Sequence, residues 1–176
     1  MVQGMGSTVS TVESDGSFIL GLSESEDTIG ISVSNLRHRF DLSKKIVYDQ
    51  TWTSEHDYFV YNDLVVGPDV VLTIERGARV FIDEDVKIIV EGRLEINGVP
   101  SDPVLFTSIL RDEPWGNVEF PAFSGGGDLN GVIFNNGGGD SNDYSPYTNS
   151  QAIIESDGTN IKLNNCFFVD NPGKAV

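Results

Sequence analysis

Oxygen-bearing side chains gather in one polar segment, residues 137–151, which reads GGGDSNDYSPYTNSQ. Asp140, Asn142 and Asp143 lie within four positions there, and a calcium ion takes about six to eight oxygen ligands. The segment lacks the Asp-x-Asp-x-Asp-Gly spacing and the closing glutamate of a known calcium loop. Two interpretations stay open: a calcium site held by these three side chains, and a plain protruding loop.

Aromatic side chains add a second kind of candidate site. Tyr144 and Tyr147 belong to the same polar segment, and Trp115 opens the run WGNVEF that precedes it. Aromatic rings stack on sugar faces, while carboxylates and amides bond sugar hydroxyls. Tyr144, Tyr147 and Trp115 are therefore the candidate ligand-binding residues, with a saccharide as the expected ligand.

The remaining acidic and imidazole side chains form no recognisable catalytic set. Glu155, Asp157 and Asp170 come late in the chain, and Asp157 precedes a glycine, which is typical of a turn. His38 and His56 each stand among charged residues, as solvated surface histidines do. We predict no catalytic residue here, which favours a chain that is not itself an enzyme.

The elements that must position these residues are short strands. Residues 65–108 contain the apolar runs VVLTI, RVFI, KIIVEG, LEI and VLFTS, which are rich in β-branched residues and separated by turn formers. Most links lack the Asn-Gly or Asp-Gly pair that marks an antiparallel hairpin. A chain that bends every few residues without reversing winds into coils, which pair in parallel and stack their apolar side chains inside.

The order of these runs resembles the first coils of right-handed parallel β-helix proteins of the pectate-lyase-like type. The chain reads Trp52-Thr53, VVGPDVVLTIERGARVFI, KIIVEGRLEI, PVLFTS and Trp115-Gly116, and the match covers roughly residues 50–136. Asn117 stands where that family carries the second glycine of W-G-G-I. The resemblance implies an all-β fold, a right-handed single-stranded parallel β-helix over residues 49–176.

The same resemblance bears on catalysis. Lyases on this fold use an acidic calcium cluster with a basic residue, and the related hydrolases use paired aspartates on adjacent coils. The D-D and G-H-G motifs of those hydrolases are absent from this sequence.

The coil pattern predicts which residues are buried and how the coils are linked. We expect about six coils of ~20 residues, and asparagines at 135, 136, 164, 165 and 171 that hydrogen-bond between coils. Trp52 is interpreted as a cap or core residue, with a carbohydrate-stacking surface as the alternative. The expected core residues are Leu72, Ile74, Val80, Ile88, Val90, Leu94, Leu105 and Phe106.

Residues 1–48 differ from the rest. Alternating strands flank Asp15-Gly16, which predicts a β hairpin that packs on or caps the coils; the alternative is a remnant of a preceding domain. The basic cluster of Arg37, Arg39, Lys44 and Lys45 is expected to pair with acidic coils. The predicted boundary between this appendage and the β-helix lies at 48/49.

Composition limits the partners. The chain of 176 residues carries a net charge of −16, which disfavours nucleic acid and anionic membranes because both need a basic face. The single cysteine, Cys166, excludes an intrachain disulfide and is interpreted as a small buried residue. The start, MVQGMGSTVS, shows no signal peptide.

Two functions stay open. The first is a non-catalytic, secreted or cell-surface module for structure, adhesion or glycan binding, whose partner is a polysaccharide or another cell-surface component. The second is the N-terminal part of a polysaccharide lyase or glycoside hydrolase with catalytic coils beyond residue 176. Phe167 and Phe168 are followed by no amphipathic cap, so we expect further coils or end-on contact with another copy.

Overall fold

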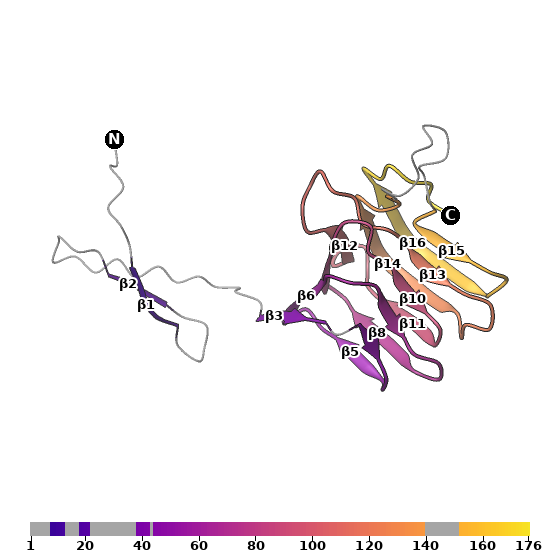
Figure 1. Cartoon of the computed structure of the whole chain (residues 1–176), viewed down its shortest axis with the longest axis horizontal. Helices are drawn as coiled ribbons and strands as arrows, with labels where there is room; N and C mark the ends of the chain where they lie inside the picture. The colour runs from indigo at the N-terminus through magenta and orange to yellow at the C-terminus, as the bar shows by residue number, and fades with distance from the viewer. Residues whose placement is uncertain (1–7, 13–17, 22–37, 43, 140–151) are drawn as a thin grey trace. The chain divides into compact units, whose positions relative to one another are not determined.

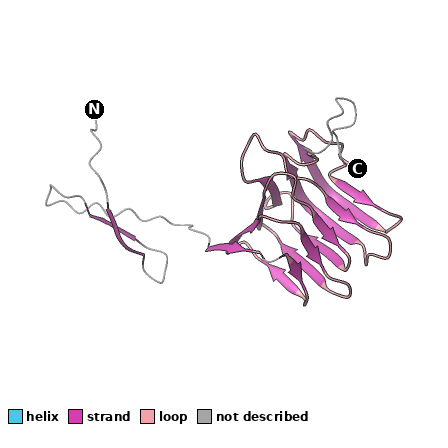
Figure 2. Ribbon diagram, in the orientation of Figure 1, coloured by secondary structure: helices cyan, strands magenta, loops and turns pink. Residues whose placement is uncertain are grey.

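The structure is a computed structural model that describes residues 8–12, 18–21, 38–42, 44–139 and 152–176 (Figure 1). The chain divides into two compact units, Met1–Leu36 and Arg37–Val176. In the first unit, β1 (Thr8–Val12) pairs antiparallel with β2 (Phe18–Gly21). The described residues form strands, bends and turns, and among them is no helix that could cross a membrane (Figure 2).

A five-stranded sheet forms one part of the second unit, and all of its pairings are parallel. Each of its strands is short because a bend follows after two or three residues. In spatial order the strands are β15 (Ile154–Ser156), β13 (Val118–Phe120), β10 (Ile88–Val90), β7 (Leu64–Val66) and β4 (Lys45–Ile46).

A nine-stranded sheet forms the other part of the second unit. It has two wings, which meet in two long strands, β14 (Gly127–Asn135) and β16 (Ile161–Val169). These two strands pair with each other. The first half of β14 continues one wing, and its second half continues the other. One wing contains β5 (Gln50–Trp52), β8 (Val71–Glu75) and β11 (Arg93–Asn97). The other contains β3 (His38–Asp41), β6 (His56–Val60), β9 (Arg79–Ile82) and β12 (Val104–Ser108).

The chain visits the five-stranded sheet, the β5–β8–β11 wing and the β6–β9–β12 wing in turn, and we call one such pass a circuit. Strands in successive circuits pair in parallel, which confirms the parallel strands predicted for residues 65–108. Hydrogen-bonded positions on successive circuits lie 22 residues apart at Asp57 and Arg79. They lie 34 apart at Asn135 and Val169. The later circuits are thus longer than the predicted ~20 residues.

Inward side chains stack on their counterparts in the next circuit. Leu72 is the register partner of Leu94, and Ile74 is the partner of Ile96; all four are buried. The predicted core residues are buried except Leu105, which is half exposed. Successive side chains of a strand point to opposite faces. In β12, Val104 and Phe106 point inward, so Leu105 between them points outward.

Two aromatic side chains, Trp52 and Tyr58, pack together in the core of the first circuit. The ring of Trp52 stacks on Tyr58 with centroids 4.5 Å apart, and Trp52 is only 2% exposed. Its indole N–H donates to Gln50 Oε1 at 3.2 Å. Trp52 is therefore a core residue rather than a carbohydrate-stacking surface.

The parallel pairing begins earlier than the predicted boundary at 48/49. Strands β3 and β4 pair with β6 and β7, so both belong to the second unit. Of the basic cluster, Lys45 forms an ion pair with Glu91 at 3.4 Å, in line with the expected pairing to acidic residues. Arg37 lies outside the described residues.

Asparagines hydrogen-bond successive circuits, as the sequence predicts. Asn171 receives the Gly137 backbone N–H at 2.7 Å and donates to the Phe134 carbonyl at 2.9 Å. Asn165 donates to Asn130 Oδ1 at 3.1 Å. These hydrogen bonds satisfy polar groups at the bends, which the hydrogen bonds between paired strands do not reach.

Within the described residues, β16 lies at the edge of its sheet. Phe168 points inward and stacks on Phe134 with centroids 5.3 Å apart. Phe167 points outward and is 51% exposed. The backbone N–H of Ile154 donates to the Ala175 carbonyl at 3.3 Å, so the last residues lie beside β15. Continuation of the stack stays a prediction.

Replacing Leu72 with alanine tests the inward assignment. Leu72→Ala removes a fully buried side chain between two circuits, so the free energy of unfolding should fall by about 2 to 5 kcal/mol. Leu105→Ala is the matched control and should cost about 1 kcal/mol or less, because that side chain points outward. Equal losses in urea titrations of the two variants would contradict the register.

Candidate ligand-binding site

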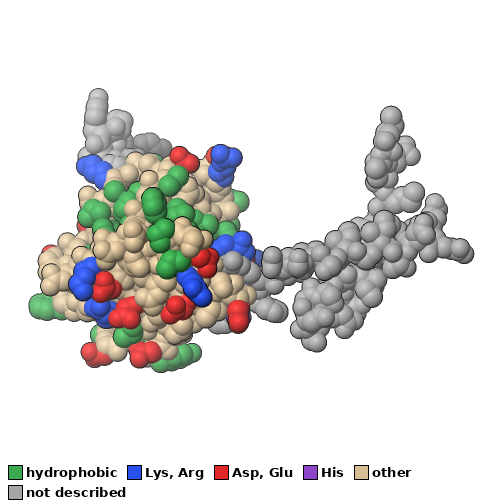
Figure 3. All heavy atoms as spheres, turned by 180° about the vertical axis from the view of Figure 1, so that it is seen from behind, with side chains coloured by type: hydrophobic (Ala, Val, Ile, Leu, Met, Phe, Trp, Pro, Cys, Tyr) green, Lys and Arg blue, Asp and Glu red, His purple; other side chains and the backbone are tan. Residues whose placement is uncertain are grey.

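An aromatic column stands on the outer face of the β6–β9–β12 wing, and it consists of Phe59, Tyr61 and Phe81. Phe59 and Phe81 are register partners whose rings stack 5.0 Å apart. Tyr61 stacks on Phe59 at 6.2 Å. Figure 3 shows hydrophobic side chains gathered on one face of the unit seen from behind. The column leaves aromatic surface partly open to solvent.

Arginines flank this aromatic column. The Arg39 guanidinium lies 4.5 Å from the ring centroid of Phe59 and donates to the Tyr61 hydroxyl. Arg79 donates two hydrogen bonds to the Asp57 carboxylate, at 2.7 and 2.6 Å. Such bidentate pairs fix both groups in one plane. The arginines therefore link strands β3, β6 and β9 beside the rings.

Polar side chains continue the column on the next circuits. Thr107 is the register partner of Phe81, and its hydroxyl donates to Asn135 Oδ1 at 3.0 Å. Asn135 in turn donates to the Val169 carbonyl at 3.1 Å. A hydroxyl and an amide held in this way can bond a ligand beside the ring of Phe81.

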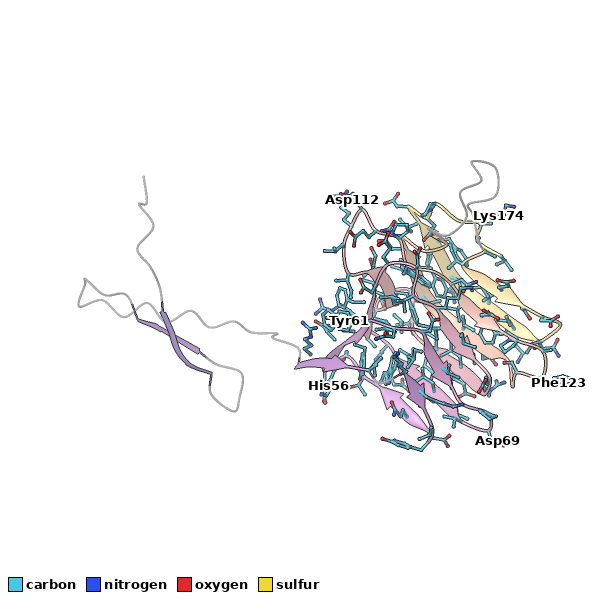
Figure 4. All side chains as sticks on the ribbon, viewed as in Figure 1. His56, Tyr61, Asp69, Asp112, Phe123 and Lys174 are labelled. Carbon is cyan, nitrogen blue, oxygen red and sulfur yellow. The ribbon has the colours of Figure 1, made fainter. Side chains whose placement is uncertain are left out.

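A hollow of ≈480 Å³ lies where this column meets the loop after β12, within the size range of about 300 to 1,000 Å³ for ligand pockets. Figure 4 labels Asp112 on that loop. We call this cavity the corner hollow. It is lined by Phe81, Thr107, Ser108, Ile109, Arg111, Asp112, Asn135, Asn136 and Asp170.

Asn136 anchors the loop that forms one wall of the corner hollow. Its amide donates to Ser108 Oγ at 2.7 Å and to the Arg111 carbonyl at 2.8 Å. Its backbone has a φ of 54°, a left-handed conformation that asparagine tolerates better than most residues. The wall is therefore hydrogen-bonded to the body of the unit.

Trp115 lies in the core, beneath the loop. The side chain is fully buried, and its ring packs near Phe106 and Phe134, each 6.4 Å away between centroids. Its indole N–H donates to the Asn135 carbonyl at 2.9 Å. The sequence predicted Trp115 as a ligand contact, but a buried ring offers a saccharide no face to stack on. Its role here is to support Asn135.

The corner hollow offers hydrogen-bond donors and acceptors against an aromatic wall. Arg111 donates and Asp112 and Asp170 accept, and the Thr107 hydroxyl, whose proton goes to Asn135 Oδ1, can accept as well. This combination suits a sugar, which presents hydroxyls at its edges and C–H groups on its faces. Of these residues, sequence reasoning singled out Asp170 and the neighbouring asparagines but not Phe81, because it carries no motif.

The remaining candidate residues are those of the predicted calcium site, the two tyrosines and Glu155. Asp140, Asn142, Asp143, Tyr144 and Tyr147 lie outside the described residues. Within the described ranges, no three His, Cys, Asp or Glu side chains gather as a metal site. Glu155 accepts a hydrogen bond from Asn117 at 3.0 Å, on the outer side of the five-stranded sheet.

Cys166 is a half-buried thiol rather than a nucleophile. It is the register partner of Val132, and its S–H donates to the Leu129 carbonyl at 3.4 Å. Burial raises the pKa of the Cys166 thiol. The thiolate, which is the reactive form, is therefore scarce at neutral pH.

The thiol chemistry can be measured directly. We expect iodoacetamide to alkylate Cys166 more slowly in the folded chain than in urea at neutral pH, because the raised pKa keeps the thiol protonated. The folded-state rate should increase as the pH rises toward that pKa. Equal rates in folded and unfolded chains at neutral pH would contradict the assignment.

Comparison of the chain with models of known protein families, with curated proteins and with solved structures finds no match.

Proposed function

We propose that this chain is a non-catalytic binding module that holds a neutral polysaccharide in the corner hollow. The observation that carries the proposal is the ring of Phe81 beside the hydrogen-bonded pair of Thr107 and Asn135. The ring would stack on one sugar, while Arg111 and Asp170 would bond its hydroxyls. We also propose that the circuits form a right-handed single-stranded β-helix of the pectate-lyase-like type, which the parallel register supports.

Charge supports a neutral ligand. The chain has a net charge of −16, so a polyanion such as polygalacturonate would be repelled at long range. Two aspartates in the corner hollow, Asp112 and Asp170, add to that repulsion locally. Hydroxyl groups of an uncharged sugar can instead donate to these carboxylates. A secreted or cell-surface location, where such polymers are met, follows as part of the proposal.

A second function is cleavage of a polysaccharide: hydrolysis of a neutral chain as part of a glycoside hydrolase, or elimination from a uronate-containing chain as part of a lyase. One observation favours it: Asp112 and Asp170 line the same hollow although they come from different circuits, and Arg111 lies with them. Glycoside hydrolases use two carboxyl groups on either side of the scissile bond. Release of reducing ends from a neutral polysaccharide, lost in Asp170→Asn, would favour this function over binding alone.

Binding can be measured by affinity electrophoresis through gels that contain hydroxyethylcellulose or galactomannan. We expect wild type to be retarded in at least one of them, and Phe81→Ala to lose about 2- to 10-fold in affinity, the usual worth of one aromatic contact. Ile89→Ala is the matched control, because Ile89 is an outward, half-buried residue on the five-stranded sheet.

Two results of this experiment would contradict the proposal. Unchanged retardation of Phe81→Ala, with Ile89→Ala also unchanged, would remove the corner hollow as the site. Retardation of wild type by polygalacturonate alone would show that the ligand is anionic and would contradict the charge argument.

A further inference from the structure

Phe123 combines an exposed ring with an unfavourable backbone. Its side chain is fully exposed, at 102% of the reference area, and its φ is 70°. It is the third residue of a turn closed by the Ser124 N–H on the Pro121 carbonyl at 3.0 Å. A positive φ at this turn position favours glycine, and a bulky residue there is an outlier. Such outliers at the surface point to function.

The turn that carries Phe123 is fixed to the neighbouring circuit. The Gly125 N–H donates to the Gly92 carbonyl at 2.8 Å, and the Gly126 N–H donates to Ser124 Oγ at 3.1 Å. A side chain on Gly126 would meet the Asn160 carbonyl at 2.4 Å. The ring therefore projects from an anchored turn, and its exposure is not the result of a loose loop.

A second hollow, of ≈450 Å³, lies beside this ring. We call it the turn hollow, and charged groups line it together with Phe123. Asp128 forms ion pairs with Arg93 at 3.6 Å and with Lys162 at 3.2 Å. Thr159 donates from its hydroxyl to the Pro121 carbonyl at 3.2 Å, which joins the two turns that form the walls.

We propose that Phe123 and the turn hollow form a second saccharide-binding site. The ligand class rests on the proposed function, whereas the site rests on separate residues. The exposed ring would stack on a sugar face, Asp128 would accept from sugar hydroxyls, and Arg93 and Lys162 would donate to them. Arg93 also pairs with Glu95 at 2.8 Å, so the two cations face two carboxylates, Asp128 and Glu95. With the charges balanced, an uncharged sugar again suits the site better than a polyanion.

Two sites on one unit make the module bivalent. Figure 4 shows Asp112, which marks the corner hollow, and Phe123 on opposite sides of the unit. The two hollows share no lining residue, so we expect them to be occupied together by a polymer or by two neighbouring polymer chains. Bivalent contact raises the apparent affinity by about 10²- to 10⁴-fold over one site.

The decisive variant is Phe123→Gly, compared by affinity electrophoresis in hydroxyethylcellulose and by thermal unfolding. Glycine takes a positive φ without strain, so the melting temperature should not fall. Retardation should weaken about 2- to 10-fold, as for Phe81→Ala, because one aromatic contact with the polymer is lost. Val47→Gly, which also removes an exposed apolar side chain, should bind as wild type does. A lower melting temperature with unchanged retardation would give Phe123 a structural role and overturn the proposal.

A fluorescent reporter separates the two sites. The native tryptophans, Trp52 and Trp115, are buried, so Phe123→Trp supplies an exposed indole that acrylamide can quench. Saturating hydroxyethylcellulose should protect this indole, and the protection should persist when Phe81→Ala is added. Lost binding in Phe81→Ala without protection of the reporter refutes only the turn hollow. Protection with unimpaired binding in Phe81→Ala refutes only the corner hollow, and no binding at all refutes both.

Discussion

Parallel pairing in register between successive circuits is the constraint on which the second unit depends. Each inward side chain rests on a counterpart one circuit away, as Leu94 does on Leu72. A slip of one residue would turn every inward side chain of that strand outward. These rows of inward side chains run through both sheets. The burial of apolar side chains in one circuit therefore stabilises the neighbouring circuits, as in other stacked repeats. The same register orders the outer face into columns.

The proposed binding surface follows from those outer columns. Phe59, Phe81, Thr107 and Asn135 occupy corresponding outward positions of successive circuits, so an aromatic strip passes directly into a polar one. The inserted loop after β12 then adds charged groups beside the junction. Asn136 anchors this loop, because its amide donates hydrogen bonds to Ser108 at the end of β12 and to the Arg111 carbonyl in the loop. The proposed site is thus built from the repeats, and the loop after β12 forms one of its walls.

The sequence predicts the repeats better than the site. Runs of β-branched residues between turn formers indicate the strands, because that pattern is local. The run VLFTS begins with three apolar residues in succession, so the pattern alone does not show which of them face the core, and the prediction that Leu105 points inward is wrong. The corner hollow unites Phe81 with Asp170, which are distant in the chain. Local patterns carry no information on contacts between residues so far apart. The prediction of Trp115 as a ligand contact is wrong for the same reason, because its ring is buried by packing near Phe106 and Phe134 of other strands.

Occupation of the corner hollow by a neutral saccharide can be tested at the side-chain amides of Asn135 and Asn136, which line that hollow. Nuclear magnetic resonance titration with cellohexaose or mannohexaose would follow their amide signals. With a neutral saccharide in the corner hollow, both amides and the Thr107 backbone signal should show saturable shifts, with little change at Ile89. Shifts confined to the five-stranded sheet, or no saturable shift with either sugar, would contradict it.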